Sequence, residues 1–152
     1  MGGTAQSMYE KGIELSMKQW GVTDPAKIAA YMVSSKTPVA PGDALNSPAL
    51  SNIAVKWSSS EAVQREQIGT QKWLALFPDG IEAWAEFRRS RYPKLYPIVN
   101  SDNADLPVGT YIRRIPFLDL EKQTNGDAVK AAVSLLNGPD KASTPLWWDT
   151  NK

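Results

Sequence analysis

The chain has 152 residues, and its 17 basic and 16 acidic side chains leave a formal net charge of +1. That length supports one domain, and the charge balance gives no reason to expect a nucleic acid or another polyanion as a partner. The sequence contains no Cys and no His. It therefore excludes disulfides, Ser-His-Asp and Cys-His hydrolases, the usual zinc enzymes and haem sites with a His ligand.

The beginning of the sequence lacks the features of a targeting segment. No basic region is followed by an apolar run, and no stretch approaches the roughly 18 consecutive apolar residues of a membrane span. The chain as given is therefore expected to be soluble, with no signal or anchor of its own.

Residues 5–33 are predicted to form two helices joined by a short turn. Thr4 is placed to cap the first helix, and Gly21 to end it. Asp24 and Pro25 have the order of an N-cap and a first helical residue, so they begin the second helix.

The first of these helices carries two apolar lines, which follow from spacings of three, four or seven residues. One line consists of Tyr9, Ile13, Met17 and Trp20, and the other of Met8 and Leu15. Gly12 lowers the stability of a helix by about 1 kcal/mol relative to Ala, which suggests that something packs closely there.

Residues 34–57 contain three prolines and are predicted to be a long connection, with one helical turn near 47–53. Two helices follow, at 58–77 and 79–89, each preceded by a capping box: Ser58 with Glu61, and Asp79 with Glu82. Their predicted core faces include Val63, Thr70, Trp73, Leu74 and Phe77 on the first, and Ile81, Trp84, Ala85 and Arg88 on the second.

Residues 92–121 are predicted to be extended, because prolines interrupt them repeatedly. A last helix is expected at 125–137, followed by a tail at 139–152. The pattern therefore predicts a mostly α fold in one domain, with about five helices and long Pro-rich connections.

Three local carboxylate pairs are the candidates for a hydrolytic dyad: Glu61/Glu66, Asp79/Glu82 and Asp102/Asp105. The first two are better explained as acids at helix N-termini. The loop 100–105 resembles a calcium loop but lacks the Gly and Glu that an EF-hand requires, so a solvated loop is expected. No catalytic residue, metal site or cofactor is predicted, and a small glycosidase is kept only as a third alternative.

The remaining candidates for contact with a ligand or partner are a basic cluster and three tryptophans. Arg88, Arg89 and Arg91 lie at the end of a helix, where cations offset the helix dipole, so a structural role is expected. Trp147 and Trp148 are adjacent, so one is expected to be buried and the other free. Trp57 lies beside the long connection and is similarly open.

A longer set of motifs is more specific, and it resembles the C-terminal region of the SusD/RagB family, the outer-membrane nutrient-binding lipoproteins of Bacteroidetes. The motifs occur in the family's order at residues 50–57, 69–80, 82–89, 92–95, 113–116 and 146–149. The residues that carry over as a structural signature are Trp73, Trp84, Arg88, Arg89, Tyr92 and Pro93.

The resemblance implies an α-helical fold with tetratricopeptide-like helix pairs and a surface-exposed lipoprotein that is not an enzyme. It also implies glycan or other oligomeric nutrient binding together with a TonB-dependent outer-membrane transporter. The alternative is a helical protein-interaction module without glycan affinity, which would use Trp147, Trp148 and the basic cluster.

The sequence departs from the family in length and in lacking the lipoprotein Cys, so it is expected to be a C-terminal fragment. Most ligand contacts would then lie in the absent part, and no ligand-binding residue is carried over. One apolar line of the helix at 5–20 would be left uncovered. We therefore expect self-association through this helix, as a two-fold dimer.

Overall fold

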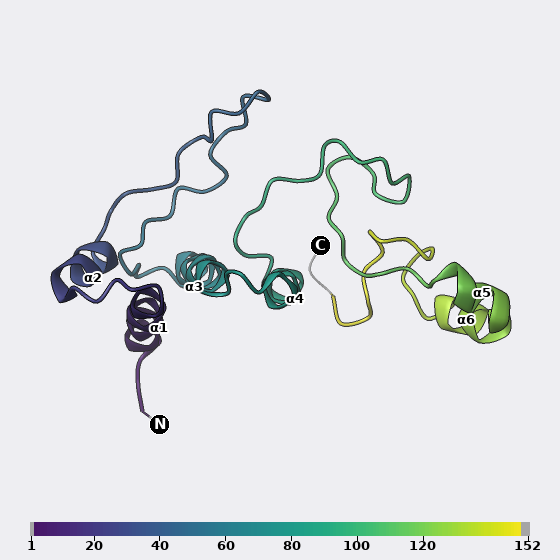
Figure 1. Cartoon of the computed structure of the whole chain (residues 1–152), viewed down its shortest axis with the longest axis horizontal. Coiled ribbons are helices and arrows are strands. Elements are labelled where there is room, and N and C mark those ends of the chain that lie inside the picture. The colour runs from purple at the N-terminus through teal and green to yellow at the C-terminus, as the bar shows by residue number, and fades with distance from the viewer. Residues whose placement is uncertain (1, 150–152) are drawn as a thin grey trace. The chain divides into compact units, whose positions relative to one another are not determined.

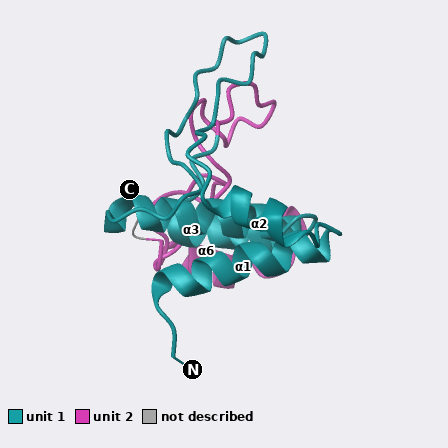
Figure 2. Cartoon of the chain, turned by 90° about the vertical axis from the view of Figure 1, so that its left-hand side faces the viewer, with its two compact units in different colours: residues 1–95 teal, residues 96–152 magenta. Residues whose placement is uncertain are grey.

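The computed structural model describes residues 2–149, and within that range it contains six helices and no strand (Figure 1). The predicted mostly α class is therefore confirmed. The chain divides into two compact units, residues 1–95 and 96–152, which Figure 2 distinguishes by colour. The single domain stays a prediction, and each unit is described by itself.

The helix pair at the start of unit 1 forms as predicted. Helix α1 spans Ala5–Gln19 and helix α2 spans Pro25–Met32. Thr4 accepts a hydrogen bond from the Ser7 amide at 3.1 Å, and Asp24 accepts one from the Ala26 amide at 2.9 Å. These caps satisfy amides that have no partner within their helices.

Helix α1 contacts both α2 and α3, and it buries only part of its apolar surface. Tyr9 and Ile13 are buried, whereas Met8 and Leu15 are each 56% exposed. The close packing predicted at Gly12 is wrong, because a Cβ added there would meet nothing within 4 Å. The second apolar line of α1 thus faces open space.

Helix α3 spans Glu61–Ala75, so it begins later than the predicted capping box. Ser60 stands at the N-cap position without a side-chain cap bond. Ser58 is held otherwise: its carbonyl accepts from Gln64 Nε2 at 2.7 Å, and its amide donates to Gln67 Oε1 at 3.1 Å. Glutamines of α3 therefore fix Ser58 outside the helix.

The buried face of α3 also differs from the predicted one. Its buried residues are Glu66, Gln67 and Gly69, while Leu74 is 53% exposed and Phe77 is 67% exposed. At Gly69, an added Cβ would lie 2.3 Å from the Cβ of Tyr92. A glycine is therefore needed where the chain after the next helix crosses α3.

Helix α4 spans Gly80–Ser90, and Asp79 caps it by accepting from the Glu82 amide at 3.0 Å. The helix packs on α3 and buries Ala83, Glu86 and Phe87. Trp84 is only half-buried, so its predicted place in the core is wrong. The buried stripe of α4 is formed by Ala83, Glu86 and Phe87, so it does not include Trp84.

The 34–57 connection leaves the helices as two arms that run beside each other and meet at a tip (Figure 1). The Lys56 amide donates to the Ser34 carbonyl at 3.0 Å, which pairs the arms at their base. At the tip, Asp43 Oδ1 accepts from the amides of Leu45 and Ser47 at 3.1 and 2.9 Å. The helical turn expected near 47–53 is absent from the described backbone, which is irregular there.

Unit 2 contains helices α5, Asp119–Thr124, and α6, Gly126–Val133, which contact each other. The segment before residue 121 was expected to be extended, so α5 is a correction. It begins after Leu118 with acids in its first turn and Lys122 in its last, which suits the helix dipole. Helix α6 ends at Val133, four residues before its predicted end, and turns lead to Gly138.

A buried ion pair organises the rest of unit 2. Arg114 is 6% exposed and pairs with Asp140. The same carboxylate accepts from the Phe117 amide at 3.2 Å and lies 3.2 Å from the Lys122 amine. Burial alone would raise the pKa of Asp140, but these three partners hold the pKa below its ordinary value.

Candidate binding site

The three tryptophans predicted as contacts lie in different surroundings. Trp57 is half-buried against Tyr9, with 4.9 Å between the ring centroids. Trp147 is 80% exposed and Trp148 is 36% exposed, so neither member of this pair is buried as expected. Their roles as ligand or partner contacts stay predictions.

The signature residues of α4 serve packing within unit 1. The Arg88 guanidinium lies 3.9 Å above the Trp84 ring, and Arg89 pairs with the buried Glu86. Lys72 of α3 reaches the same carboxylate at 2.7 Å. Burial would raise the pKa of Glu86, but these two cations hold it below its ordinary value. The structural role expected for the basic cluster therefore has direct support at Arg88 and Arg89.

Four of the six carboxylates considered for a dyad, those of Glu61, Glu66, Asp79 and Asp105, are engaged in local structure. Glu61 pairs with Arg65 on an exposed face of α3, at 2.6 Å. Glu66 is 6% exposed; it accepts from Ser51 Oγ at 2.5 Å and lies 3.1 Å from the Lys94 amine. Asp79 caps α4, as described above.

The 100–105 loop is stabilised by its own side chains. Ser101 Oγ accepts from the Asn103 amide at 3.1 Å, and Asn103 Oδ1 accepts from the Asp105 amide at 2.8 Å. Asp105 also lies 3.5 Å from the Lys141 amine. Among residues 2–149, no group of three or more metal-ligating acids comes together.

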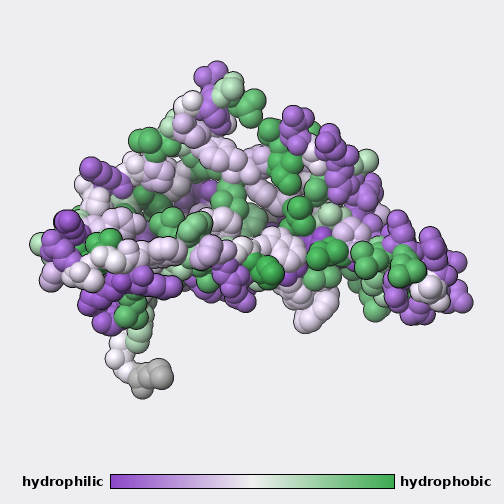
Figure 3. Space-filling model, in the orientation of Figure 1, coloured by the Kyte–Doolittle hydropathy of each residue, from purple (hydrophilic) through white to green (hydrophobic). Residues whose placement is uncertain are grey.

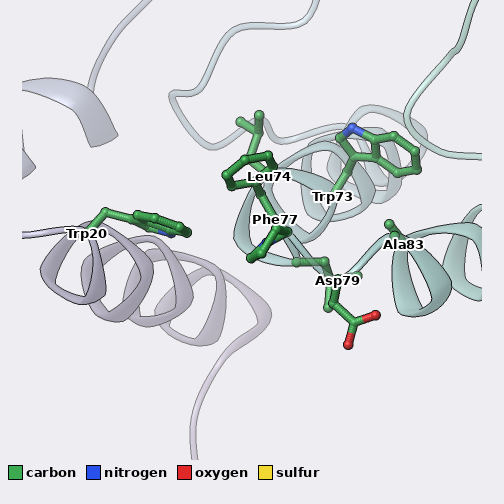
Figure 4. Close-up of a pocket in the computed structure, with 9 residues that line it drawn as sticks. Trp20, Trp73, Leu74, Phe77, Asp79 and Ala83 are labelled. Atoms are coloured by element: carbon green, nitrogen blue, oxygen red, sulfur yellow. The ribbon is translucent and has the colours of Figure 1, made fainter.

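An apolar pocket of about 450 Å³ lies where α1 ends, between the end of α3 and the start of α4 (Figure 4). The rings of Trp20 and Phe77 lie 5.6 Å apart and are tilted by 46°. In Figure 4 the carboxylate of Asp79 points away from these rings. The pocket thus presents carbon surface with few polar groups, which suits apolar side chains of a protein better than a hydroxylated ligand.

A second apolar hollow, of about 360 Å³, lies between α1 and α3. It is lined by Ala5, Met8, Tyr9, Gly12, Ile13, Ile68, Gln71, Lys72 and Ala75. Small residues on both helices keep it open, and it includes Met8 of the uncovered line of α1. Hydrophobic residues reach the visible surface at several places in the space-filling view (Figure 3).

A third cavity, of about 570 Å³, is called the polar cavity below because hydroxyl and amide side chains join its otherwise apolar lining. It is open to solvent and is lined by residues of α1, α2, α3 and both arms of the 34–57 connection. Its lining residues are Tyr9, Ala30, Tyr31, Ser34, Lys36, Pro38, Ile53, Ala54, Val55, Gln67, Thr70, Gln71 and Leu74. Hydroxyl and amide groups therefore alternate with aromatic and aliphatic surface.

Hydrogen bonds fix the wall of the polar cavity that residues 54–56 form. Gln67 is 1% exposed, and its Nε2 donates to the carbonyls of Ala54 and Lys56 at 2.8 and 2.7 Å. Tyr9 donates its hydroxyl to the Val55 carbonyl at 2.7 Å. Burial, with smaller contributions from Tyr31 and Glu10, raises the pKa of Tyr9 to about 12, so this donor keeps its proton at neutral pH.

The polar cavity has little signal in the sequence, because the residues that line it are far apart along the chain. Tyr31 and Gln71 meet across 40 residues, with Gln71 Nε2 donating to the Tyr31 hydroxyl at 3.0 Å. One signal was present: Gln64, Gln67 and Gln71 recur at helical spacing along one face of α3. A line of glutamines on one helix face indicates side chains that can bind the backbone of a neighbouring segment.

The sequence matches the SusD-like family, described as SusD and RagB outer membrane lipoprotein, over residues 1–149. The chain belongs to the SusD/RagB family. No curated protein matches the sequence.

Solved members of the family share the fold. A SusD homologue from Bacteroides thetaiotaomicron is 33% identical, with a TM-score of 0.86 over 100% of this chain and 34% of its own. A chitin-binding SusD homologue from Flavobacterium johnsoniae is 40% identical, with a TM-score of 0.82 over 99% of this chain and 32% of its own. A second SusD-like protein from B. thetaiotaomicron is 37% identical, with a TM-score of 0.84 over 100% of this chain and 33% of its own.

The chain therefore spans about one third of the length of the solved SusD relatives that it matches. Within residues 2–149, none of the helices is long and apolar enough to cross a membrane.

Proposed function

We propose that this chain is part of a non-catalytic glycan-binding component of an outer-membrane nutrient-uptake system. The observation that carries the proposal is the family match over residues 1–149. It is supported by a relative that is 40% identical and described as chitin-binding. The polar cavity adds a physical reason, since hydroxyls, amides and aromatic faces are the groups that hold a sugar.

The engaged carboxylates support a binding role without turnover. A glycosidase needs two carboxyl groups that face one bond of the substrate across a shared cavity. Glu66 and Glu86 are instead buried with cations, and Asp79 caps α4. We expect no release of reducing sugar from chitin, starch or xylan, and turnover that disappears when one of these acids is replaced would contradict the proposal.

Glycan binding can be tested directly with the purified chain. We expect isothermal titration calorimetry with hexasaccharides of N-acetylglucosamine, glucose and xylose to show saturable binding of at least one of them. A folded chain that binds none of a broad glycan panel would overturn the proposal.

The proposal extends to the uptake system, in which the full-length protein is a surface-exposed lipoprotein that acts with a TonB-dependent transporter. The apolar surface around Trp20 and Phe77 is suited to a protein partner. Size-exclusion chromatography of a full-length relative with its transporter, in detergent, should show co-elution.

The second candidate function is a protein-interaction module without glycan affinity. The exposed rings of Trp20, Phe77 and Trp147 favour it, since such rings are common at interfaces. Binding of a protein partner by a chain that ignores the whole glycan panel would favour this alternative.

A further inference from the structure

We propose that the polar cavity is a subsite for one residue of a neutral glycan, which the hydrogen-bonded pair Tyr31 and Gln71 would contact. The proposal rests on the glycan-binding function proposed above and adds the place and the contacts. The volume of about 570 Å³ lies within the roughly 300–1,000 Å³ that small-molecule sites occupy.

The charge of the lining selects for a neutral ligand. None of the described residues that line the cavity carries a carboxylate, and the exposed Lys36 is its one cation. Its hydrogen-bonding side chains include Tyr31, Ser34, Thr70 and Gln71, which are all uncharged. Such groups match hydroxyls, which donate and accept, and offer little to a phosphate or a metal ion.

Tyr31 and Gln71 supply the two elements that a pyranose ring requires. Both side chains are half-buried. Their mutual contacts are 3.0 Å from Gln71 Nε2 to the Tyr31 hydroxyl and 3.3 Å from that hydroxyl to Gln71 Oε1. A primary amide has two N–H donors and two acceptor lone pairs, so this pairing leaves part of its capacity for a ligand. The phenol ring offers a flat apolar face to the C–H face of a sugar.

The cavity is preformed, because hydrogen bonds within the protein hold its wall in place without a ligand. The bonds from Gln67 to Ala54 and Lys56, and from Tyr9 to Val55, hold residues 54–56 against α1 and α3. A wall fixed in this way reduces the conformational entropy that binding would otherwise cost. The apolar pocket near Trp20 lacks this combination of polar lining and fixed wall, so it is not the sugar site.

Two variants remove the proposed contacts with little change of shape. Gln71→Met keeps the side-chain length and removes the amide, and Tyr31→Phe keeps the ring and removes the hydroxyl. We expect the hexasaccharide that binds the unaltered chain to bind Gln71→Met at least about fivefold more weakly. Gln19→Met, the same substitution at an exposed position of α1 outside the lining, should bind within about twofold.

Nuclear magnetic resonance of the full chain locates the sugar independently of affinity. Addition of the hexasaccharide should shift the side-chain amide signals of Gln71, and these signals should be unmoved by tri-galacturonic acid, an acidic probe, at equal concentration. Thermal melting by circular dichroism identifies any variant that has lost its fold, and Tyr31→Phe then serves in place of Gln71→Met.

The outcomes separate this proposal from the function on which it rests. If Gln71→Met and Tyr31→Phe both bind as the unaltered chain does, the sugar lies elsewhere and the subsite is wrong, while glycan binding stands. Tighter binding of the acidic probe in the cavity would overturn the neutral ligand class. If the unaltered chain binds no glycan, the proposed function fails and the subsite fails with it.

Discussion

Two glycines of unit 1 have opposite surroundings, and alanine distinguishes them. A Cβ at Gly69 would lie 2.3 Å from the Cβ of Tyr92, and because a Cβ moves only with its own backbone, the backbone must shift. We expect Gly69→Ala to lower the free energy of unfolding by about 1–3 kcal/mol, the usual effect of overpacking. Gly12→Ala is the matched control, and it should raise stability by up to about 1 kcal/mol, because nothing lies near it. Urea denaturation measures both, and equal effects would contradict the packing seen at Tyr92.

Trp84 gives a second prediction at the same scale. It is half-buried and covered by the Arg88 guanidinium, a contact worth about 0.5–1 kcal/mol at an exposed site. We expect Trp84→Ala to reduce the free energy of unfolding by about 1–2 kcal/mol, below the roughly 3–5 kcal/mol of a fully buried tryptophan. Trp147→Ala, at an 80% exposed position, should change it by less than about 0.5 kcal/mol. If Trp84→Ala lowered the free energy of unfolding by more than about 3 kcal/mol, Trp84 would belong to the core after all.

At the scale of single residues, the sequence predicted most helix N-caps correctly, but it did not predict where residues pack closely. The capping roles of Thr4, Asp24 and Asp79 depend on neighbours two or three positions away, and all three are confirmed. The close approach assigned to Gly12 was wrong, and the real one at Gly69 was missed, because each depends on a distant segment. Such contacts have no local signal.

Among the elements, Asp140 joins three segments of unit 2: residues 113–117, helix α5 and the chain after α6. Its pKa is lower in the folded chain than its ordinary 3.8, so the folded state favours the charged form. The stability it contributes is therefore full above about pH 4 and is lost as the pH falls through the folded pKa.

We expect Asp140→Asn to lower the free energy of unfolding by about 1–3 kcal/mol at pH 7, as for other hydrogen bonds to charged groups. As the pH falls below about 4 the unaltered chain should lose more stability than the variant, because the variant has no carboxyl to protonate there. Urea denaturation at several pH values measures the difference. If the free energy of unfolding changed with pH in the same way for both proteins, protonation of Asp140 would not account for the loss of stability in acid.

The elements themselves were predictable where periodicity or capping is strong. Helices α1, α2 and α4 lie within a residue or two of their predicted bounds. Helix α5 was missed because six residues give little periodicity, and the start of α3 was misplaced because glutamines within the helix capture Ser58. The polar cavity could not be predicted, since it exists only once α2, α3 and the two arms of 34–57 come together.

For the whole molecule, the uncovered line of α1 predicts self-association. Met8 and Leu15 are each 56% exposed, and Trp20 is 53% exposed at the helix end. Burial of apolar surface contributes about 25 cal/mol per Å², so pairing such a surface is favourable. We expect a two-fold dimer, since one patch on two copies can be self-complementary.

Light scattering at micromolar concentration tests this expectation. Met8→Gln with Leu15→Gln should shift the chain to the monomer mass. Leu135→Gln, at an 80% exposed position of unit 2, should leave the mass unchanged. A monomeric unaltered chain would show that the line on α1 does not drive association.

The two arms of the 34–57 connection are hydrogen-bonded to the rest of unit 1 at their base, whereas the tip around Asp43 is held by local hydrogen bonds. This difference should determine how fast their backbone amide hydrogens exchange with solvent. At the base, the amides of Lys56 and Ser58 are bonded to Ser34 and to the buried Gln67, so their hydrogens should exchange only when unit 1 opens. At the tip, Asp43 bonds only its near neighbours Leu45 and Ser47, and those hydrogens should exchange far sooner. A cut or an inserted sequence near Asp43 would therefore leave both arms anchored, which makes the tip a natural site for carrying a fluorophore or an epitope without disturbing the helices.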